Sequence, residues 1–314
     1  MTDASNSPCT AARTDASDKG ALNAVISSLY VYPVKSCGGV SVQQAILTET
    51  GLEFDRAWMV VDQRGQFLTQ RELPRMALIQ PQLKHYEMVL RAPGMLALHV
   101  ALNAVEAAVK VRVWRDEVPA YDMGATAAQW LTDFLGCTAR LVRFNPAHKR
   151  VSSRRWTGQV AAFNQFSDGY PLLCISEASL RDLNGRLLAS GSAAVGMQRF
   201  RPNIVLGDGP TSPGADDGQA FLPHDEDRVD VLRVCTDQGM VQLKPVKPCA
   251  RCPIPNIDPA TGVASPEVGD ALQTYRQDAR VKGAVTFGMN VIALDGLEHV
   301  LKVGQAVTAT YGFR

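Results

Sequence analysis

The sequence has no long hydrophobic run and almost no net charge. It contains no apolar stretch of about 18 residues, the length needed to cross a membrane, and residues 1–20 lack the apolar core of a signal peptide. We therefore expect neither a membrane span nor secretion. Lysine and arginine number 32 against 31 for aspartate and glutamate, which gives a formal charge of +1. Without a basic field the chain is not expected to bind nucleic acid, and any anion site must be local.

Cysteine and histidine are too scattered for a common disulfide or metal framework. The seven cysteines are an odd number and lack the dense spacing of a secreted disulfide scaffold, so a cytoplasmic location is expected. The five histidines show no ligand spacing. Residues 1–22 are largely small and polar and are predicted to form a disordered tail, in which Cys9 has no structural role.

Short alternating runs predict that the chain after this tail is rich in strands. Residues 25–32 are mostly β-branched or aromatic and end before Pro33, and Arg64-Gly65 separates two further strand-like runs as in a hairpin. The same alternation returns at residues 109–113. We assign residues 23–145 to an N-terminal β-rich domain.

Two segments have helical rather than alternating spacing. Residues 126–135 precede Gly136, which can end a helix, and Ser176 is expected to cap a second helix whose leucines recur every three or four residues. Five strand-like runs follow, at 203–206, 229–235, 239–244, 284–294 and 305–311, with a polar loop over 207–227. The predicted fold class is α+β, rich in strands with a few helices, and residues 146–314 form the second domain.

The most informative stretch contains two thiols, Cys249 and Cys252, which flank Arg251 in a proline-rich loop. A nearby guanidinium favours the thiolate, the form that attacks electrophiles or binds soft metals. A zinc site would need two more ligands, and the sequence has no second Cys-x-x-Cys pair. A thioredoxin-like pair would need a helix, which the surrounding prolines disfavour. Ordinary loop cysteines, a zinc site and a thiolate on a metal with its own other ligands stay open.

Cationic and polar side chains recur at the ends of the predicted strands. Lys35 and Ser36 lie in a glycine-bearing loop after the first strand, and such a loop can present several donors to one oxyanion. Ser167 and Asp168 precede a buried strand, where the local sequence alone favours the aspartate as a turn residue that bonds its own backbone. Further residues of this kind lie near other strand ends: Arg56, Arg71, Arg201 and Asn203.

A basic cluster spans Lys149, Arg150, Arg154 and Arg155 beside Trp156. Interleaved cations and aromatic rings are one mode of binding single-stranded nucleic acid. We interpret this cluster instead as a solvated loop or as a docking patch for an acidic electron donor.

Six motifs occur in order along the chain. They are Tyr32-Pro-Val-Lys-Ser-Cys, Asp55-Arg-Ala-Trp, Val113-Trp-Arg-Asp, Ser176-Glu-Ala-Ser-Leu-Arg-Asp-Leu-Asn, Phe200-Arg-Pro-Asn and Cys249-Ala-Arg-Cys-Pro-Ile. Together they resemble the MOSC-domain proteins, in the subgroup with a MOSC N-terminal domain that includes the mitochondrial amidoxime-reducing component and its bacterial relatives. The resemblance implies an N-terminal β-rich MOSC_N domain followed by a barrel-like MOSC domain.

The resemblance also implies a molybdenum cofactor, in which molybdopterin holds the metal between the two domains. In the family the second cysteine of the motif ligates the metal, which is Cys252 here, and Asp168 matches an active-site carboxylate. The residues that would hold the pterin and its phosphate are Lys35, Ser36, Arg56, Ser167, Arg201, Asn203 and Arg251.

Two departures from the family pattern bear on function. Pro255 stands three residues after Cys252, where the family usually has threonine, so a hydroxyl near the metal is missing. The sequence contains no Cys-x4-Cys-x2-Cys run for an iron–sulfur cluster, and we expect no mitochondrial anchoring segment. Electrons are therefore expected from a separate protein that resembles a ferredoxin, a cytochrome b5 or a flavin reductase, and the enzyme is expected to be soluble and cytoplasmic.

The activity expected from the resemblance is the reduction of N-hydroxylated compounds such as hydroxylamines, amidoximes or N-hydroxylated bases. Asp168 would position a proton for the departing oxygen or hold the substrate nitrogen. The alternative is a molybdenum-cofactor carrier or sulfur-handling protein, which would bind molybdopterin without turnover.

Overall fold

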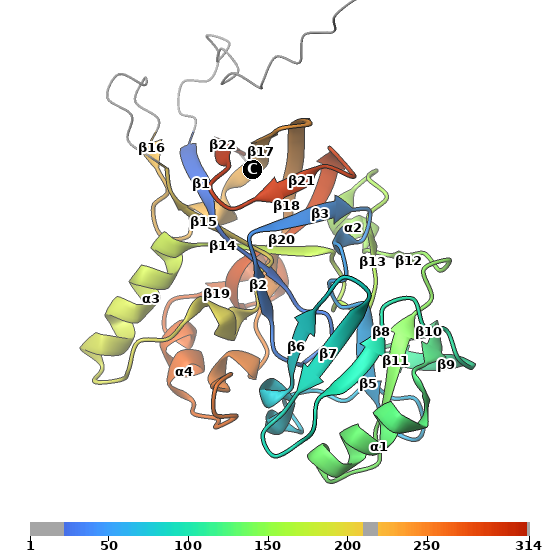
Figure 1. The fold of residues 1–314 in the computed structure, drawn as a ribbon. Helices are drawn as coiled ribbons and strands as arrows, with labels where there is room; N and C mark the ends of the chain where they lie inside the picture. Colours follow the sequence, from blue (N-terminus) through green and yellow to red (C-terminus); the bar gives the residue numbers. More distant parts are fainter. Residues whose placement is uncertain (1–21, 210–218, 313–314) are drawn as a thin grey trace, which may run out of the picture.

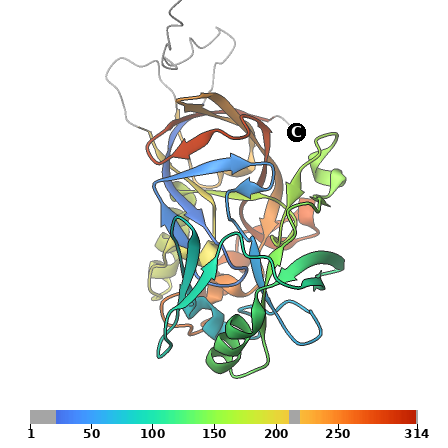
Figure 2. The ribbon, with the colours of Figure 1, turned by 45° about the vertical axis from the view of Figure 1, so that its right-hand side comes forward.

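The structure is a computed structural model that describes residues 22–209 and 219–312. In this part of the chain, seven strands close a barrel (Figures 1 and 2). Going round the barrel the order is β14, β15, β1, β22, β17, β18 and β20, and β14 pairs with β20 to close the ring. The strands are β1 (Leu22–Val31), β14 (Leu172–Ser176), β15 (Ile204–Asp208), β17 (Val229–Thr236), β18 (Gly239–Ala250), β20 (Ala284–Asp295) and β22 (Ala306–Tyr311). Among these neighbours only β14 and β15 are parallel.

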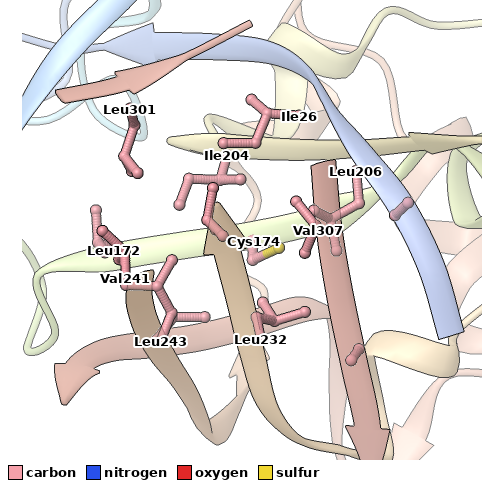
Figure 3. Packing of buried hydrophobic residues seen from close by; sticks show 14 of the residues in the cluster. Ile26, Leu172, Cys174, Ile204, Leu206, Leu232, Val241, Leu243, Leu301 and Val307 are labelled. Carbon is pink, nitrogen blue, oxygen red and sulfur yellow. The ribbon is translucent and has the colours of Figure 1, made fainter. Parts of the chain in front are cut away.

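The barrel is filled by apolar side chains that alternate along its strands. Figure 3 shows residues from several barrel strands, among them Ile26, Cys174, Leu232 and Val307, pointing toward one another. Each of these four side chains is at most 1% exposed. Burial of this apolar surface is the main force that stabilises the barrel, because roughly 25 cal/mol is gained per Å² removed from water.

Smaller sheets flank the barrel, two of them below it and one beside its strands (Figure 1). One consists of β5 (Trp58–Val61), β9 (Ala108–Val113), β10 (Asp116–Asp122) and β11 (Arg140–Phe144), and α1 (Gly124–Leu135) packs on it. Another consists of β6 (Gln80–Leu83), β7 (Glu87–Arg91) and β8 (Leu98–Ala101). A third sheet pairs strands that are far apart in the sequence. It consists of β3 (Gln44–Thr48), β4 (Gly51–Leu52) and β21 (Val300–Lys302).

Short elements complete the described fold. The remaining strands are β2 (Val40–Val42), β12 (Arg150–Val151), β13 (Phe163–Asn164), β16 (Gln219–Ala220) and β19 (Gln277–Asp278). The remaining helices are α2 (Arg154–Thr157), α3 (Glu177–Ala189) and α4 (Glu267–Gln273), with 3-10 turns η1 (Pro74–Leu78), η2 (Met197–Phe200), η3 (Asp225–Asp227), η4 (Ile254–Asn256) and η5 (Ala279–Val281). None of the helices in the described ranges is long and apolar enough to span a membrane.

The strand-rich α+β fold and both predicted helices are confirmed. Gly136 ends α1 in the left-handed conformation with φ 71°, a conformation that glycine adopts without a Cβ clash. Ser176 caps α3, because its side chain accepts a hydrogen bond from the backbone amide of Ser179. These local signals were sufficient because each element is defined by residues close in sequence.

The predicted ends of the N-terminal tail and of one strand were wrong. Leu22 does not belong to a disordered tail, because it begins β1 and is fully buried, whereas residues 1–21 lie outside the described residues. Strand β18 does not end at residue 244 but continues through Pro245 and Pro248, where its ladder with β20 shifts register to accommodate residues without an amide hydrogen. The division at residue 145 stays a prediction, although β1 from the first half lies in the barrel.

Candidate functional site

A cavity of about 740 Å³ lies where loops from both halves of the chain meet. The side chains that the sequence analysis assigned to catalysis, metal ligation or cofactor binding all line it. They are Lys35, Ser36, Arg56, Ser167, Asp168, Arg201, Asn203, Arg251 and Cys252. The fold therefore brings together groups that are far apart in the sequence, while the role of each group stays a prediction.

The wall of this cavity is strongly positive, although the chain as a whole is nearly neutral. Its lining includes seven cationic side chains and two carboxylates. The cations are Lys35, Arg56, Arg71, Arg115, Arg150, Arg201 and Arg251, and the carboxylates are Asp116 and Asp168. Cations held together in a partly dehydrated wall repel one another, and an anion placed among them relieves this repulsion. The cavity thus suits a ligand that carries several negative charges.

Two of these arginines, Arg56 and Arg201, share the ring of Tyr32. Their guanidinium carbons lie 4.5 and 4.2 Å from the ring centroid. Arg56 donates to the carbonyl of Arg201 at 3.1 Å and to the amide oxygen of Asn203 at 3.2 Å, and it forms an ion pair with Asp55. Burial, and next the charge of Arg56, lower the pKa of Arg201 to about 10. The two arginines are therefore fixed close together despite their like charge.

A third anchored cation, Lys35, holds Asp168. The Lys35 ammonium donates to Asp168 Oδ1 at 2.5 Å and to the carbonyl of Phe166 at 2.8 Å, and Trp114 Nε1 donates to the same carboxylate oxygen at 3.1 Å. Partial desolvation by the cavity wall would raise the pKa of Asp168, but the charge of Lys35 and these hydrogen bonds outweigh it and hold the pKa well below its usual range. Burial lowers the pKa of Lys35 against the opposing effect of Asp168. Asp168 is thus an ionised acceptor at neutral pH, with 68% of its side-chain surface exposed.

The two thiols have different surroundings, and the expectation that both lie in a proline-rich loop was wrong for Cys249, which belongs to strand β18, whereas Cys252 lies in the loop that follows. Cys249 and Cys252 are free and both line the cavity. Arg251 Nη1 donates to Cys249 Sγ at 3.1 Å and its Nη2 donates to the carbonyl of Phe200 at 2.9 Å. The guanidinium expected beside a thiol therefore contacts the first cysteine. In residues 22–209 and 219–312, Arg251 Nε is a buried donor without a partner, which leaves one N–H available to a bound ligand.

Within the same ranges, no three His, Cys, Asp or Glu side chains lie close enough to hold a metal ion by themselves. A zinc site, one of the alternatives for the thiol pair, is therefore not formed by Cys249 and Cys252 with described neighbours. A metal bound by Cys252 would receive its other ligands from a bound group.

Several cavity residues have an unusual backbone conformation. The left-handed region is occupied by Ser36 (φ 64°), Arg56 (φ 51°), Trp114 (φ 56°) and Arg201 (φ 59°). This conformation costs a residue with a side chain roughly 1–2 kcal/mol, so the surrounding contacts must hold it in place. Strain of this kind concentrates at functional sites, where it aims side chains at a ligand.

The loop that carries Ser167 is held by a buried arginine. Arg150 is 8% exposed, and its Nη1 donates to Asn164 Oδ1 at 2.6 Å and to the carbonyls of Gln165 and Ser167 at 2.9 and 2.6 Å. The interpretation of Arg150 as part of a solvated basic loop was therefore wrong, because protein acceptors replace water around this guanidinium. The Ser167 hydroxyl donates to the carbonyl of Tyr170 at 2.8 Å, so it meets a ligand as an acceptor.

Trp114 is a residue of the site that was not predicted from the sequence. This side chain is 44% exposed, lines the cavity and packs edge-on against Phe67 with ring centroids 5.1 Å apart. The guanidinium of Arg71 lies 4.8 Å from the Trp114 ring centroid. Trp114 was part of a quoted motif, but its left-handed backbone, which turns it into the cavity, has no local sequence signature.

Comparisons with known proteins agree with this arrangement. Residues 23–138 match the MOSC N-terminal beta barrel domain, and residues 163–308 match the MOSC domain. The chain is 37% identical over 266 residues to mitochondrial amidoxime-reducing component 1 of Homo sapiens, covering 80% of this chain and 72% of that protein. It is 32% identical over 292 residues to mitochondrial amidoxime-reducing component 1 of Danio rerio, covering 88% and 82%.

Among solved structures, the YUAD protein from Bacillus subtilis overlaps 93% of this chain and 98% of its own, with a TM-score of 0.39 and 10% identity, which is too loose to support a conclusion. The two domain matches, by contrast, extend over both halves of the chain and include the lining residues of the cavity other than Arg150. The chain therefore belongs to the MOSC-domain proteins that carry a MOSC N-terminal domain.

Proposed function

We propose that the cavity binds a molybdenum cofactor and that the protein is a molybdenum-dependent reductase of N-hydroxylated compounds. The observation that carries this proposal is the convergence of the predicted cations, amide and thiol on one positively charged cavity. The names of the relatives, which are amidoxime-reducing components, support the reaction class.

The residues of the cavity fit this cofactor. Molybdopterin carries a phosphate and a dithiolene, and both are anionic groups that cations and backbone donors bind well. Arg56 and Arg201 are fixed as a pair suited to a phosphate, and Arg251 Nε is a buried donor without a protein partner in the described ranges. Cys252 supplies a soft thiolate ligand, which suits molybdenum better than a carboxylate would.

Each group then has a specific task. Lys35, Arg56, Arg201 and Arg251 hold the cofactor and compensate its charge, and Cys252 ligates the metal. When bound, the cofactor supplies the two-electron chemistry that removes oxygen from an N–O bond. In the overall reaction R–NHOH takes up two electrons and two protons and leaves as R–NH2 and water. The protein orients the substrate.

Asp168 is better suited to hold the substrate than to protonate it. Its lowered pKa and its contacts with Lys35 and Trp114 keep the carboxylate ionised at neutral pH. An ionised carboxylate accepts hydrogen bonds, so it would receive an N–H of the substrate and fix the N–O bond relative to the cofactor. Asp168 is therefore proposed as an orienting group in contact with substrate.

The cytoplasm stays the proposed compartment of the protein.

The first experiment compares the cofactor content of the wild-type protein with that of Cys252→Ser and Cys249→Ser. All three are expressed with molybdate in a host that makes the cofactor, and molybdenum is measured by mass spectrometry and pterin by fluorescence after oxidation. We expect about one molybdenum and one pterin per wild-type chain, loss of molybdenum in Cys252→Ser, and retention of molybdenum in Cys249→Ser, because only one thiolate ligates the metal.

The same preparations distinguish enzyme from carrier. Loaded wild-type protein should reduce benzamidoxime to benzamidine with an artificial electron donor, and Cys252→Ser should lose this activity. Full loading without turnover would favour the cofactor carrier. Zinc without pterin, or no metal after loading, would contradict the proposal and return both cysteines to a structural role.

A further inference from the structure

A basic patch borders the cavity on the side of β18. We define it as Arg154, Arg155 and Trp156 of α2 together with Lys247 of β18. The guanidinium carbon of Arg155 lies 5.5 Å from the Trp156 ring centroid, and Lys247 Nζ lies 5.8 Å from the same centroid. The two arginines are exposed, and α2 packs against β18. The basic patch is therefore one continuous surface.

Lys247 connects the basic patch to the cavity. Its ammonium lies 5.6 Å from the ring centroid of Tyr170, and Tyr170 lines the cavity. Asn290, another lining residue, donates to the backbone carbonyl of Lys247 at 3.2 Å. Lys247 also precedes Cys249 by two residues on the strand that leads to the thiol loop. A protein bound on the patch would therefore sit against the wall of the candidate site.

The cations of the basic patch are not neutralised by neighbours in the described chain. No Asp or Glu oxygen described lies within 4.0 Å of the charged groups of Arg154, Arg155 or Lys247. The adjacent Lys149, in contrast, forms an ion pair with Glu49. Exposed unpaired arginines around a half-buried tryptophan are typical of protein interfaces, where these residues contribute most of the binding energy.

We propose that the basic patch docks the acidic face of the protein that delivers electrons to the bound cofactor. This inference rests on the proposed function, because a two-electron reduction at the cavity needs a donor that is itself oxidised. Positive charge at the cavity margin would steer an acidic donor and orient its redox centre toward the site. Three cations and one aromatic ring are fewer than the four to eight basic residues typical of a lipid-binding cluster, so a protein partner is favoured over a membrane.

The test uses the holoenzyme and reverses the two exposed charges in Arg154→Glu/Arg155→Glu. The matched control is Arg91→Glu/Arg228→Glu, which reverses two exposed arginines that do not line the cavity. The donors are a reduced acidic [2Fe–2S] ferredoxin and the reduced acidic haem domain of a cytochrome b5. Reduced methyl viologen serves as the small donor, assayed at about 0.5 M KCl to screen its own charge.

We expect the patch variant to lose at least about tenfold in kcat/KM for the protein donor at about 50 mM salt, with the loss shrinking as salt is raised. Turnover with the viologen should match the wild type, and the control variant should behave as the wild type with every donor. Binding of the oxidised donors, measured by calorimetry, should weaken in parallel, and this readout needs no turnover.

Other outcomes overturn the inference. They are failure of both acidic donors to bind the wild-type protein, equal losses in the patch and control variants, or binding to phosphatidylserine vesicles that the patch variant loses. If wild-type holoenzyme reduces no N-hydroxylated substrate even with viologen, the proposed function fails instead, and calorimetry still decides whether the basic patch binds the donor.

Discussion

At the residue scale, Tyr32 is the side chain on which the cationic wall of the cavity depends. Its ring is 1% exposed and contacts the guanidinium groups of both Arg56 and Arg201, while its buried hydroxyl has no partner among the described residues. The ring therefore does the positioning and the hydroxyl does not. A Cβ at Gly39 would lie 2.4 Å from Tyr32 Cε1, so glycine is needed there to leave room for the ring.

This arrangement predicts that phosphate affinity depends on the aromatic ring of Tyr32 and not on its hydroxyl, which two substitutions can separate. Tyr32→Leu should weaken the binding of inorganic phosphate to the cofactor-free protein by about tenfold, because two cation–π contacts are lost. Tyr32→Phe should bind phosphate as the wild type and unfold at the same or a higher temperature, because it removes a buried unpaired hydroxyl. Calorimetric titration and thermal unfolding measure both effects, and Gly39→Ala should resemble Tyr32→Leu. Equal phosphate affinity in all four proteins would show that the ring only fills space.

At the element scale, helix α3 begins on a buried carboxylate. Glu226 is 1% exposed and accepts from the hydroxyls of Ser176 and Ser179 at 2.9 and 2.7 Å and from the backbone amide of Ser176 at 3.2 Å. Burial raises the pKa of Glu226 above its ordinary value, although the hydrogen bonds oppose this shift. The first turn of α3 is thus coupled to η3 through a carboxyl group whose pKa is higher in the folded protein than in the unfolded chain.

The pH dependence of unfolding should reveal this group. For an acid whose pKa is raised on folding, the contribution to stability is largest below the unfolded pKa and falls as pH rises toward the folded pKa. The unfolding temperature of the wild type, relative to Glu226→Gln, should therefore decline from about pH 4.5 upward, where an unfolded glutamate titrates. Thermal unfolding of both proteins between about pH 4 and 8 measures this. Glu177→Gln, in the first turn of α3, controls for the loss of a carboxylate near this helix end. Parallel curves of unfolding temperature against pH for the wild type and Glu226→Gln would contradict the prediction.

Elements with local signals could be predicted from the sequence, whereas features that arise from distant contacts could not. The Ser176 cap and the Gly136 stop are signals within one helical turn, and both were identified correctly. The strand character of Pro245 and Pro248 was missed because it depends on pairing with β20, about 40 residues away. The candidate site residues were found through motifs, but the contact of Arg251 with Cys249 instead of Cys252 depends on the folded loop.

At the scale of the whole molecule, the barrel is completed by the first described strand. Strand β1 lies between β15 and β22, so removing it leaves two unpaired edges and opens the core to water. The sequence matches divide the chain into two domains, at 23–138 and 163–308, but the strand pairing does not separate there. The cavity also draws its lining from both halves. The closed barrel and the cavity therefore both need residues from the two halves of the chain.

A fragment experiment tests this coupling. Residues 146–312 expressed alone should aggregate or remain unfolded, because they lack β1, although they contain the whole MOSC match at residues 163–308. Appending residues 22–43 after residue 312 through a flexible linker should restore soluble protein with a cooperative thermal transition, since the missing strand can then pair with β15 and β22. The matched control appends the same residues with Ile26 and Leu29, both fully buried, changed to Asp, and it should fail to fold. A monomeric, cooperatively folded 146–312 fragment would mean that the C-terminal half is an independent domain and that β1 adds stability without completing the fold.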